Sequence, residues 1–119
     1  MRRTLVPIAL AAFVLALALA PAGAAPRPKT VRVADTFFAP DSLTIRKGTL
    51  VRFNWVGVMS HDVTKSSGPG RFFQSGPPQA GEGVLYKRRF SKPGKYRLIC
   101  TVHKGMDMNL RVKRKRSRG

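Results

Sequence analysis

The stretch CTVHKGMDM, residues 100–108, gathers most of the chemically distinctive side chains of this chain. It holds the only cysteine, Cys100, together with His103 and two of the four methionines, and the other histidine, His61, lies 39 residues before the cysteine. Two imidazoles and one thiolate in a plane, with a weak axial thioether, form the ligand set of a type 1 copper centre. The residues therefore predict one copper ion, Cu(I) or Cu(II), bound by His61, Cys100, His103 and a methionine.

The donor types favour copper over other interpretations. Thiolate and thioether are soft donors that suit copper, whereas structural zinc sites usually need closed sets of Cys and His, for which this chain has too few. A Cys100–His103 pair could also act as a nucleophile, but that chemistry needs an orienting third group and an oxyanion site, and the local sequence suggests neither. We therefore expect no catalytic residues and no enzyme activity.

The first residues resemble an export signal. Arg2 and Arg3 precede an almost wholly apolar run from Leu5 to Ala20, and small residues follow at Ala22-Gly23-Ala24. The run is shorter than the roughly 20 residues that span a bilayer. We predict a cleaved signal peptide over residues 1–24, a flexible lead-in over 25–30, one domain over 31–112 and a basic tail over 113–119. The protein should then be secreted or periplasmic and not span the membrane after cleavage. A lone cysteine in an oxidising compartment points again to a metal.

The charge is strongly positive. The formal net charge is +18, and residues 25–119 hold 21 Lys and Arg against 5 Asp and Glu. Such a surface attracts anionic partners. Export argues against nucleic acid, so we expect an acidic redox partner protein or an anionic cell-envelope surface, and a monomeric chain.

Short runs with period-two alternation predict an all-β fold. The clearest run is 50–55, whose Val51, Phe53 and Trp55 should face the core. Sustained helical periodicity is absent, and turn residues separate the runs, so we predict an antiparallel β-sandwich. We expect Phe72 and Phe73, in the loose region 66–83, to pack against the body, and 84–90 to form a charged edge strand. The other expected strands are 30–34, 43–46, 62–64, 96–100 and 109–113.

Two segments resemble the cupredoxins of the plastocyanin and amicyanin group. The C-terminal one is YRLICTVHKGM, residues 96–106, preceded by Phe90 and Pro93-Gly94. The other is His61-Asp62-Val63, which follows the strand FNW at 53–55. The resemblance implies a Greek-key β-sandwich with copper at one end, bound by His61, Cys100 and His103, with His103 near an apolar surface that serves as the electron exit.

The resemblance leaves two methionines as alternatives for the axial ligand. Cys-x2-His-x2-Met, the amicyanin-like spacing, selects Met106, whereas the plastocyanin-like spacing Cys-x2-His-x4-Met selects Met108. We prefer Met106, because Met108 falls on the inward face of the last strand and is explained as core. The chain departs from the family at Asp62, where an Asn often bonds between the ligand loops.

Three functions from different classes fit these residues. The first is transfer of single electrons through a copper site made of two histidines, one cysteine and one methionine. The second is copper binding, storage or delivery outside the cytoplasm without redox relay. The third is an adhesion or interaction sandwich with an incidental metal site.

Overall fold

The structure is a computed structural model that describes residues 25–114 together with residues 4, 7, 11 and 12. The expected signal peptide 1–24 lies outside the described residues apart from those four, and so does the basic tail beyond Arg114. Helix is absent from the described part, which accordingly holds no helix long and apolar enough to cross a membrane.

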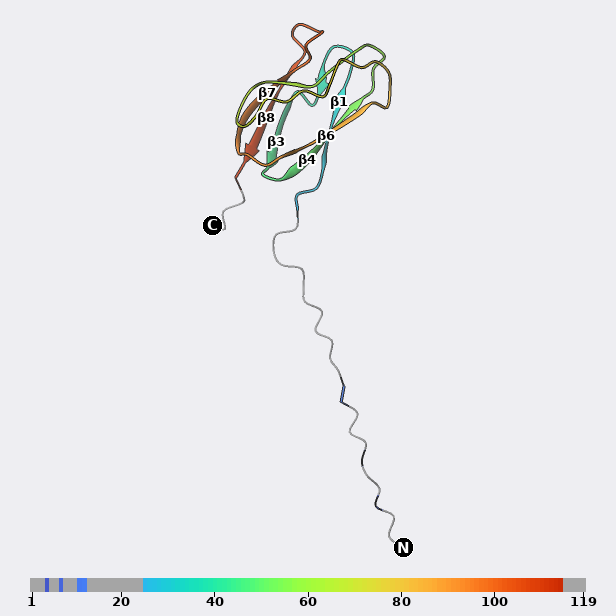
Figure 1. Ribbon diagram of the computed structural model, residues 1–119, viewed down its shortest axis with the longest axis vertical. Helices are drawn as coiled ribbons and strands as arrows, with labels where there is room; N and C mark the ends of the chain where they lie inside the picture. Colours follow the sequence, from blue (N-terminus) through green and yellow to red (C-terminus); the bar gives the residue numbers. More distant parts are fainter. Residues whose placement is uncertain (1–3, 5–6, 8–10, 13–24, 115–119) are drawn as a thin grey trace.

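Eight strands form two four-stranded sheets that pack face to face (Figure 1). The first sheet has the order β2-β1-β4-β6, and the second has the order β3-β8-β7-β5. The all-β sandwich predicted from the sequence is thus confirmed. The strands are β1 Lys29–Val33, β2 Phe38–Ala39, β3 Ser42–Arg46, β4 Thr49–Trp55, β5 Thr64–Ser67, β6 Leu85–Phe90, β7 Gly94–Ile99 and β8 Asp107–Lys113.

The sheets are mixed rather than purely antiparallel. β1 pairs with β4 in parallel, and β3 pairs with β8 in parallel, whereas the other pairings are antiparallel. Alternation of apolar residues shows which side chains face inward but says nothing of strand direction. The expectation of antiparallel pairing throughout was therefore wrong at these two pairs, which join strands distant in sequence.

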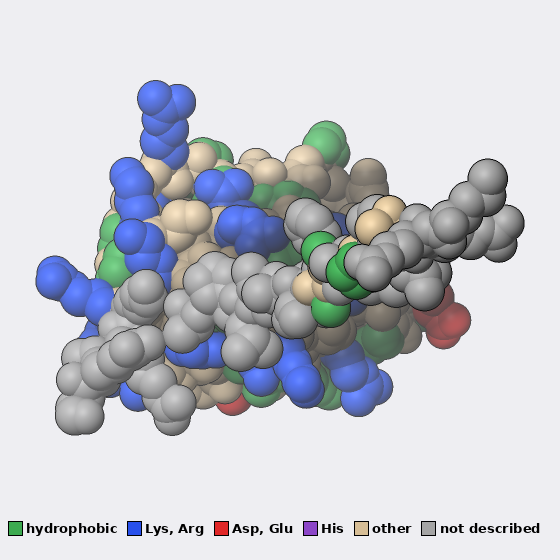
Figure 2. Space-filling model, turned by 90° about the horizontal axis from the view of Figure 1, so that it is seen from below, with side chains coloured by type: hydrophobic (Ala, Val, Ile, Leu, Met, Phe, Trp, Pro, Cys, Tyr) green, Lys and Arg blue, Asp and Glu red, His purple; other side chains and the backbone are tan. Residues whose placement is uncertain are grey.

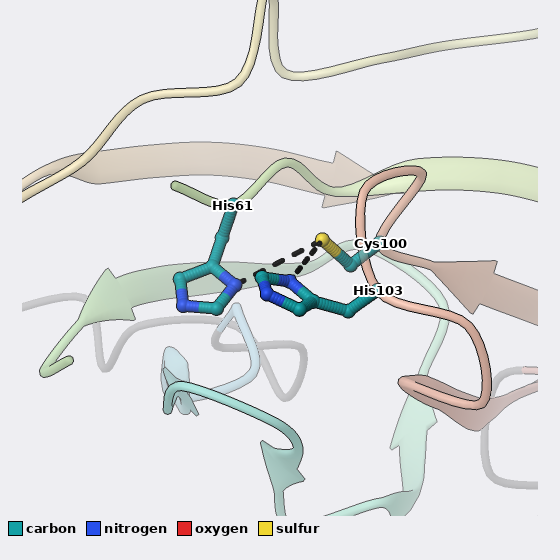
Figure 3. Close-up of side chains that lie close together, drawn as sticks. All are labelled: His61, Cys100 and His103. Atoms are coloured by element: carbon teal, nitrogen blue, oxygen red, sulfur yellow. Dashed lines mark hydrogen bonds between the residues drawn. The ribbon is translucent and has the colours of Figure 1, made fainter. Parts of the chain in front are cut away.

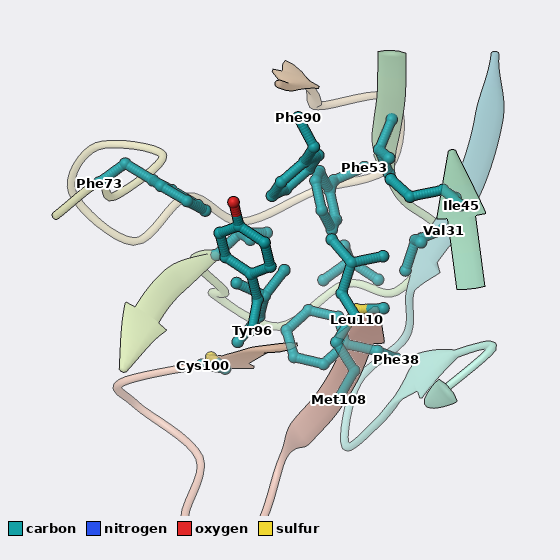
Figure 4. Packing of buried hydrophobic residues seen from close by; sticks show 14 of the residues in the cluster. Val31, Phe38, Ile45, Phe53, Phe73, Phe90, Tyr96, Cys100, Met108 and Leu110 are labelled. Atoms are coloured by element: carbon teal, nitrogen blue, oxygen red, sulfur yellow. The ribbon is translucent and has the colours of Figure 1, made fainter. Parts of the chain in front are cut away.

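The core lies between the two sheets (Figure 4). In β4 the predicted inward residues Val51, Phe53 and Trp55 are all buried, and Arg52 between them is exposed. In β8 the inward side chains of Met108 and Leu110 are buried in the same way. Burying one face of each sheet removes a large apolar area from water, which is the main stabilising term for a domain of this size.

The region 66–83 and its neighbours correct some local expectations. Phe73 is buried as expected, but Phe72 is 69% exposed, so only one of the adjacent pair packs against the body. Successive side chains of extended chain point in opposite directions, which explains why only one can reach the core. The strand expected at 62–64 is β5, Thr64–Ser67. The strand at 84–90 is β6, which lies at the edge of the first sheet as expected.

β1 begins at Lys29, inside the segment predicted as a lead-in, and β8 ends at Lys113. β4 and β7 belong to different sheets, but both strands end at the same end of the sandwich, so the loops that follow them lie close together. These two loops carry His61 and Cys100. The first loop is tied back to β4, because the Trp55 indole Nε1 donates a hydrogen bond to the carbonyl of Gln79, whose backbone is paired with His61.

Candidate metal centre

Three of the predicted ligands converge at one end of the sandwich. The Cys100 Sγ lies 3.8 Å from His61 Nδ1 and 3.5 Å from His103 Nδ1. One ligand atom from each residue lies within 4.8 Å of the others, and Figure 3 shows the three side chains pointing toward one another. His61 and Cys100 are buried, whereas His103 is partly exposed. The geometry thus offers two imidazole nitrogens and one sulfur to a single ion.

The position of Cys100 follows from strand β7. Tyr96, Leu98 and Cys100 alternate along the chain and are all buried, so the thiol continues the inward face of the strand. The chain then turns tightly, since the Cys100 N–H donates to the Met106 carbonyl and the Met106 N–H donates to the His103 carbonyl. Gly105 has a φ of +83°, a conformation that glycine adopts without strain. This loop returns His103 toward the sulfur.

His61 is held from both sides. Its backbone exchanges two hydrogen bonds with Gln79, each 2.9 Å long. Its ring nitrogen Nε2 lies 3.2 Å from the carboxylate Oδ1 of Asp35, in the loop after β1. A carboxylate accepts a hydrogen bond from the Nε2–H, which keeps the proton on Nε2 and leaves the Nδ1 lone pair facing the sulfur, as a metal ligand requires. The ring orientation and tautomer of His61 are thus matched to the cluster.

Asp35 is a site residue that sequence reasoning missed. Its carboxylate accepts a 2.9 Å hydrogen bond from the Met59 N–H, and this bond, followed by the His61 bond, lowers the pKa of Asp35. Gly57 makes room for it, because a Cβ there would lie 2.0 Å from Asp35 Oδ1. No local motif marks Asp35, since the contact joins residues 26 positions apart.

Asp62 connects the two ligand-bearing loops. It is fully buried, and its carboxylate accepts hydrogen bonds from both the N–H and the hydroxyl of Thr101, which directly follows Cys100. Thr64 and Gln74 donate two more, at 3.2 and 3.3 Å. The residue that departs from the family pattern therefore still bonds between the ligand loops, now with a carboxylate in place of an amide.

The two methionines occupy different places. Met106 is buried in the loop between His103 and β8, and Met108 is buried within β8, paired with Leu98 of β7. Met108 belongs to the sandwich core shown in Figure 4, as the sequence predicted.

Exposed apolar side chains lie in the loops at this same end. Val102 precedes His103 and is 47% exposed. Val58, Met59 and Phe37 are also exposed, and their backbones lie around Asp35. The partly exposed His103 therefore lies at an end of the sandwich that also carries exposed apolar side chains.

An all-β sandwich that gathers two imidazoles and one thiol at one end has the fold and donor set of a copper-binding cupredoxin. Residues 29–114 match the family model described as copper binding proteins of the plastocyanin/azurin family, and the chain belongs to that family. The predicted family is thus confirmed, and copper is the cofactor that its donor atoms fit.

Individual relatives agree with this assignment. The chain is 34% identical over 110 residues to amicyanin-alpha of Methylorubrum extorquens, covering 87% of this chain and 92% of that protein. The oxidized plastocyanin of Dryopteris crassirhizoma superposes with a TM-score of 0.60 and 28% identity, over 71% of this chain and 99% of that chain.

A larger copper protein shares the fold. The Cu-containing nitrite reductase NirK of Thermus scotoductus SA-01 superposes with a TM-score of 0.63 and 29% identity, over 75% of this chain. This chain spans only 23% of the length of that enzyme, whereas it spans nearly all of the plastocyanin. The likeness to the reductase is therefore a likeness to one part of it.

Proposed function

We propose that this protein is an exported type 1 copper protein that carries single electrons. His61, Cys100 and His103 would bind the metal in a plane through Nδ1, Sγ and Nδ1. The observation that carries this proposal is the approach of these three atoms to within 4.8 Å of one another at a buried end of the sandwich. Copper, when bound, supplies the one-electron couple.

We further propose Met106 as the axial ligand. Its loop position and its backbone bonds to Cys100 and His103 tie it to the same turn as two of the ligands. Met108 instead lies within strand β8, where it is paired with Leu98 of β7.

The surrounding residues are suited to a site that changes little when one electron moves. Asp35 holds His61, Asp62 holds the loop that follows Cys100, and β7 fixes the thiol itself. Rigid ligands reduce the rearrangement between the two oxidation states, and bonds to the outer atoms of the ligands tune the potential. His103, whose edge reaches the surface, is the proposed point of electron exit.

The proposed setting is outside the cytoplasm. Residues 1–24 would be removed as a signal peptide, residues 31–112 would form the copper domain, and residues 113–119 would extend it as a basic tail. The redox partner would be acidic, or the protein would associate with an anionic envelope surface, and the chain would act as a monomer. Strong positive charge and a single unpaired thiol support this setting.

The decisive experiment is a copper titration of the purified apoprotein. Addition of Cu(II) should produce an intense blue thiolate-to-copper band with one ion per chain. Cys100→Ser should abolish the band, and the exposed control Met59→Leu should retain it. A protein that takes up only zinc, or that binds Cu(II) without a blue band, would contradict the proposal.

A second measurement separates electron relay from copper delivery. Electron relay requires fast reversible one-electron cycling with no loss of copper. Copper that moves to an acceptor protein on mixing, together with slow or irreversible cycling, would favour delivery instead.

A further inference from the structure

The acidic residues all lie toward the end that carries the metal site. Asp35, Asp62 and Asp107 lie in or beside the loops of the site, since Asp107 pairs with Ile99 at the end of β7. Glu82 precedes Gly83, whose N–H donates to the carbonyl of Trp55 at the end of β4. The last acidic residue, Asp41, also lies near this end. Its backbone carbonyl accepts a hydrogen bond from the N–H of Asn109, which is the third residue of β8 counted from the end that carries the metal site.

The opposite end of the sandwich is formed by strand ends and turns that hydrogen-bond to one another. The Lys47 N–H donates to the Lys113 carbonyl, and the Gly48 N–H donates to the Phe90 carbonyl. Gly94, the first residue of β7, pairs with Val112 near the end of β8. Residues from both sheets therefore meet on one surface here.

This surface is cationic, and we name it the basic pole. It carries exposed Lys and Arg side chains, and acidic side chains are absent from it within residues 25–114. Figure 2 looks onto the molecule from this end and shows Lys and Arg over much of the described surface, with Asp or Glu side chains visible only at its rim. The basic pole comprises Arg46, Lys47, Arg89, Lys92, Lys113 and Arg114.

The two ends are electrostatically independent. The six residues of β7 separate them by about 20 Å, at roughly 3.3 Å per residue. The Debye length at physiological ionic strength is about 8 Å. The carboxylates near the metal site therefore do not offset the field of the basic pole.

We propose that the basic pole docks on the anionic headgroups of a phospholipid surface. Like charges spread over strand ends and turns from both sheets suit an extended anionic surface. Clusters of about four to eight Lys and Arg are the sequence feature that binds anionic lipid. The charge continues in the sequence after Arg114 with Lys115, Arg116 and Arg118.

The point where the chain enters the domain agrees with an orientation in which the basic pole faces the membrane. Ala25 and Pro26 line one surface hollow together with Arg46 and Thr49, so the chain enters the domain at the basic pole. An export signal ahead of Ala25 would hold that pole toward the membrane until cleavage. This step rests on the export proposed above. Docking through this pole turns the metal site away from the membrane and leaves the surface around His103 free for a redox partner.

Vesicle binding by the exported, copper-loaded protein tests the proposal. We expect binding to vesicles containing phosphatidylglycerol, no binding to phosphatidylcholine alone, and loss of binding as salt rises. The pole variant Lys47→Gln/Lys92→Gln/Lys113→Gln should bind about 100-fold more weakly, at about one kcal/mol for each cation removed. The control Arg32→Gln/Arg52→Gln/Lys87→Gln removes the same charge from exposed positions in β1, β4 and β6 and should bind within about threefold of the parent protein.

Two results would overturn the proposal. Equal losses in the two variants would show that net charge, rather than the basic pole, drives binding. Failure to bind phosphatidylglycerol vesicles while binding polyglutamate would assign the pole to an acidic protein instead. Neither result affects the blue copper band, so this proposal can fail while the proposed electron-transfer function stands.

Discussion

At the scale of single residues, the orientation of His61 depends on a carboxylate from a distant loop. Asp35 accepts from Nε2, and Gly57 leaves the space in which that carboxylate lies. A hydrogen bond to the outer nitrogen of a ligating imidazole fixes the tautomer and makes the ligand more basic. Asp35 is therefore a positioning residue for the proposed copper site.

Asp35→Ala should weaken copper binding about tenfold or more, because mutation of such outer partners typically costs roughly 10–100-fold in metal affinity. Competition against a chelator measures this, and Asp41→Ala, an exposed carboxylate away from His61, is the matched control. Gly57→Ala should reproduce the loss by displacing the carboxylate. Unchanged affinity in both variants would show that His61 is held by its Gln79 backbone pairing alone.

The two methionines give the second prediction at this scale. Met106→Leu should change the copper spectrum and the reduction potential, because it removes the proposed axial sulfur. Met108→Leu should leave the spectrum unchanged and cost less than about 1.5 kcal/mol of unfolding free energy, as a swap of similar volume in the core. The opposite pattern of spectral change would make Met108 the axial ligand.

At the scale of elements, a buried carboxylate joins the two loops that carry the ligands. Asp62 lies in the connection between β4 and β5, and its carboxylate accepts a hydrogen bond from the N–H of Thr101, the residue after Cys100. Within the described residues every buried side-chain nitrogen and oxygen has a partner, so the network around Asp62 is complete.

Asp62→Ala should lower the free energy of unfolding of the apoprotein by about 1–3 kcal/mol, because it leaves the buried Thr64 hydroxyl and the partly buried Thr101 N–H without their acceptor. Asp62→Asn, which keeps an acceptor oxygen, should cost less. Urea unfolding measures both, and Glu82→Ala, at an exposed position, should have little effect. A loss as small for Asp62→Ala as for Glu82→Ala would mean that the loops are joined by other contacts.

Strand β7 gives a prediction about alkaline pH. Tyr96 is buried and its hydroxyl donates to the Lys92 carbonyl in the turn before the strand. Burial raises the pKa of Tyr96, and the nearby positive charge of Arg88 partly opposes this. A raised folded-state pKa gives stability that is full below the unfolded pKa and is lost as pH rises through the folded pKa.

The contribution of Tyr96 should therefore be constant below about pH 10, the pKa of an unperturbed tyrosine, and decline above it. Tyr96→Phe should flatten this part of the stability–pH curve without changing its form at lower pH. Chemical denaturation of the apoprotein across alkaline pH provides the measurement. Identical alkaline slopes for both proteins would contradict the assignment.

At the scale of the whole molecule, the proposed copper site joins parts of the chain that the two sheets hold separately. His61 follows a strand of the first sheet, and Cys100 follows a strand of the second. A ligand that binds only the folded state stabilises it by about 4 kcal/mol at a thousandfold excess over its Kd.

Copper loading should consequently raise the melting temperature, and the rise should grow with copper concentration. Calorimetry of the holoprotein and apoprotein tests this, with Cys100→Ser as the control that should show little copper-dependent shift. An equal shift in Cys100→Ser would place the stabilising copper elsewhere, at surface groups unrelated to the predicted ligands.

The strands and the core were largely predictable, since period-two alternation directly reports which residues face inward. Val51, Phe53 and Trp55 of β4 and Leu110 of β8 are buried as that pattern indicated. The parallel β1–β4 and β3–β8 pairs were not predictable in this way, because alternation is the same for either direction.

The sequence by itself determined the types of donor atom, the order in which they occur and the inward face on which Cys100 lies. These properties depend on the residue types themselves and on the alternation of neighbouring residues along a strand. The residue types predicted that His61 and Cys100 share one site, but only the tertiary structure decided how closely they approach, that Asp35 holds the His61 ring and that Asp62 joins the two loops. The tertiary structure also decided that Lys and Arg side chains gather in one pole far from the metal site. These relations depend on sheet pairing between residues distant in the chain, and no local pattern in the sequence carries that information.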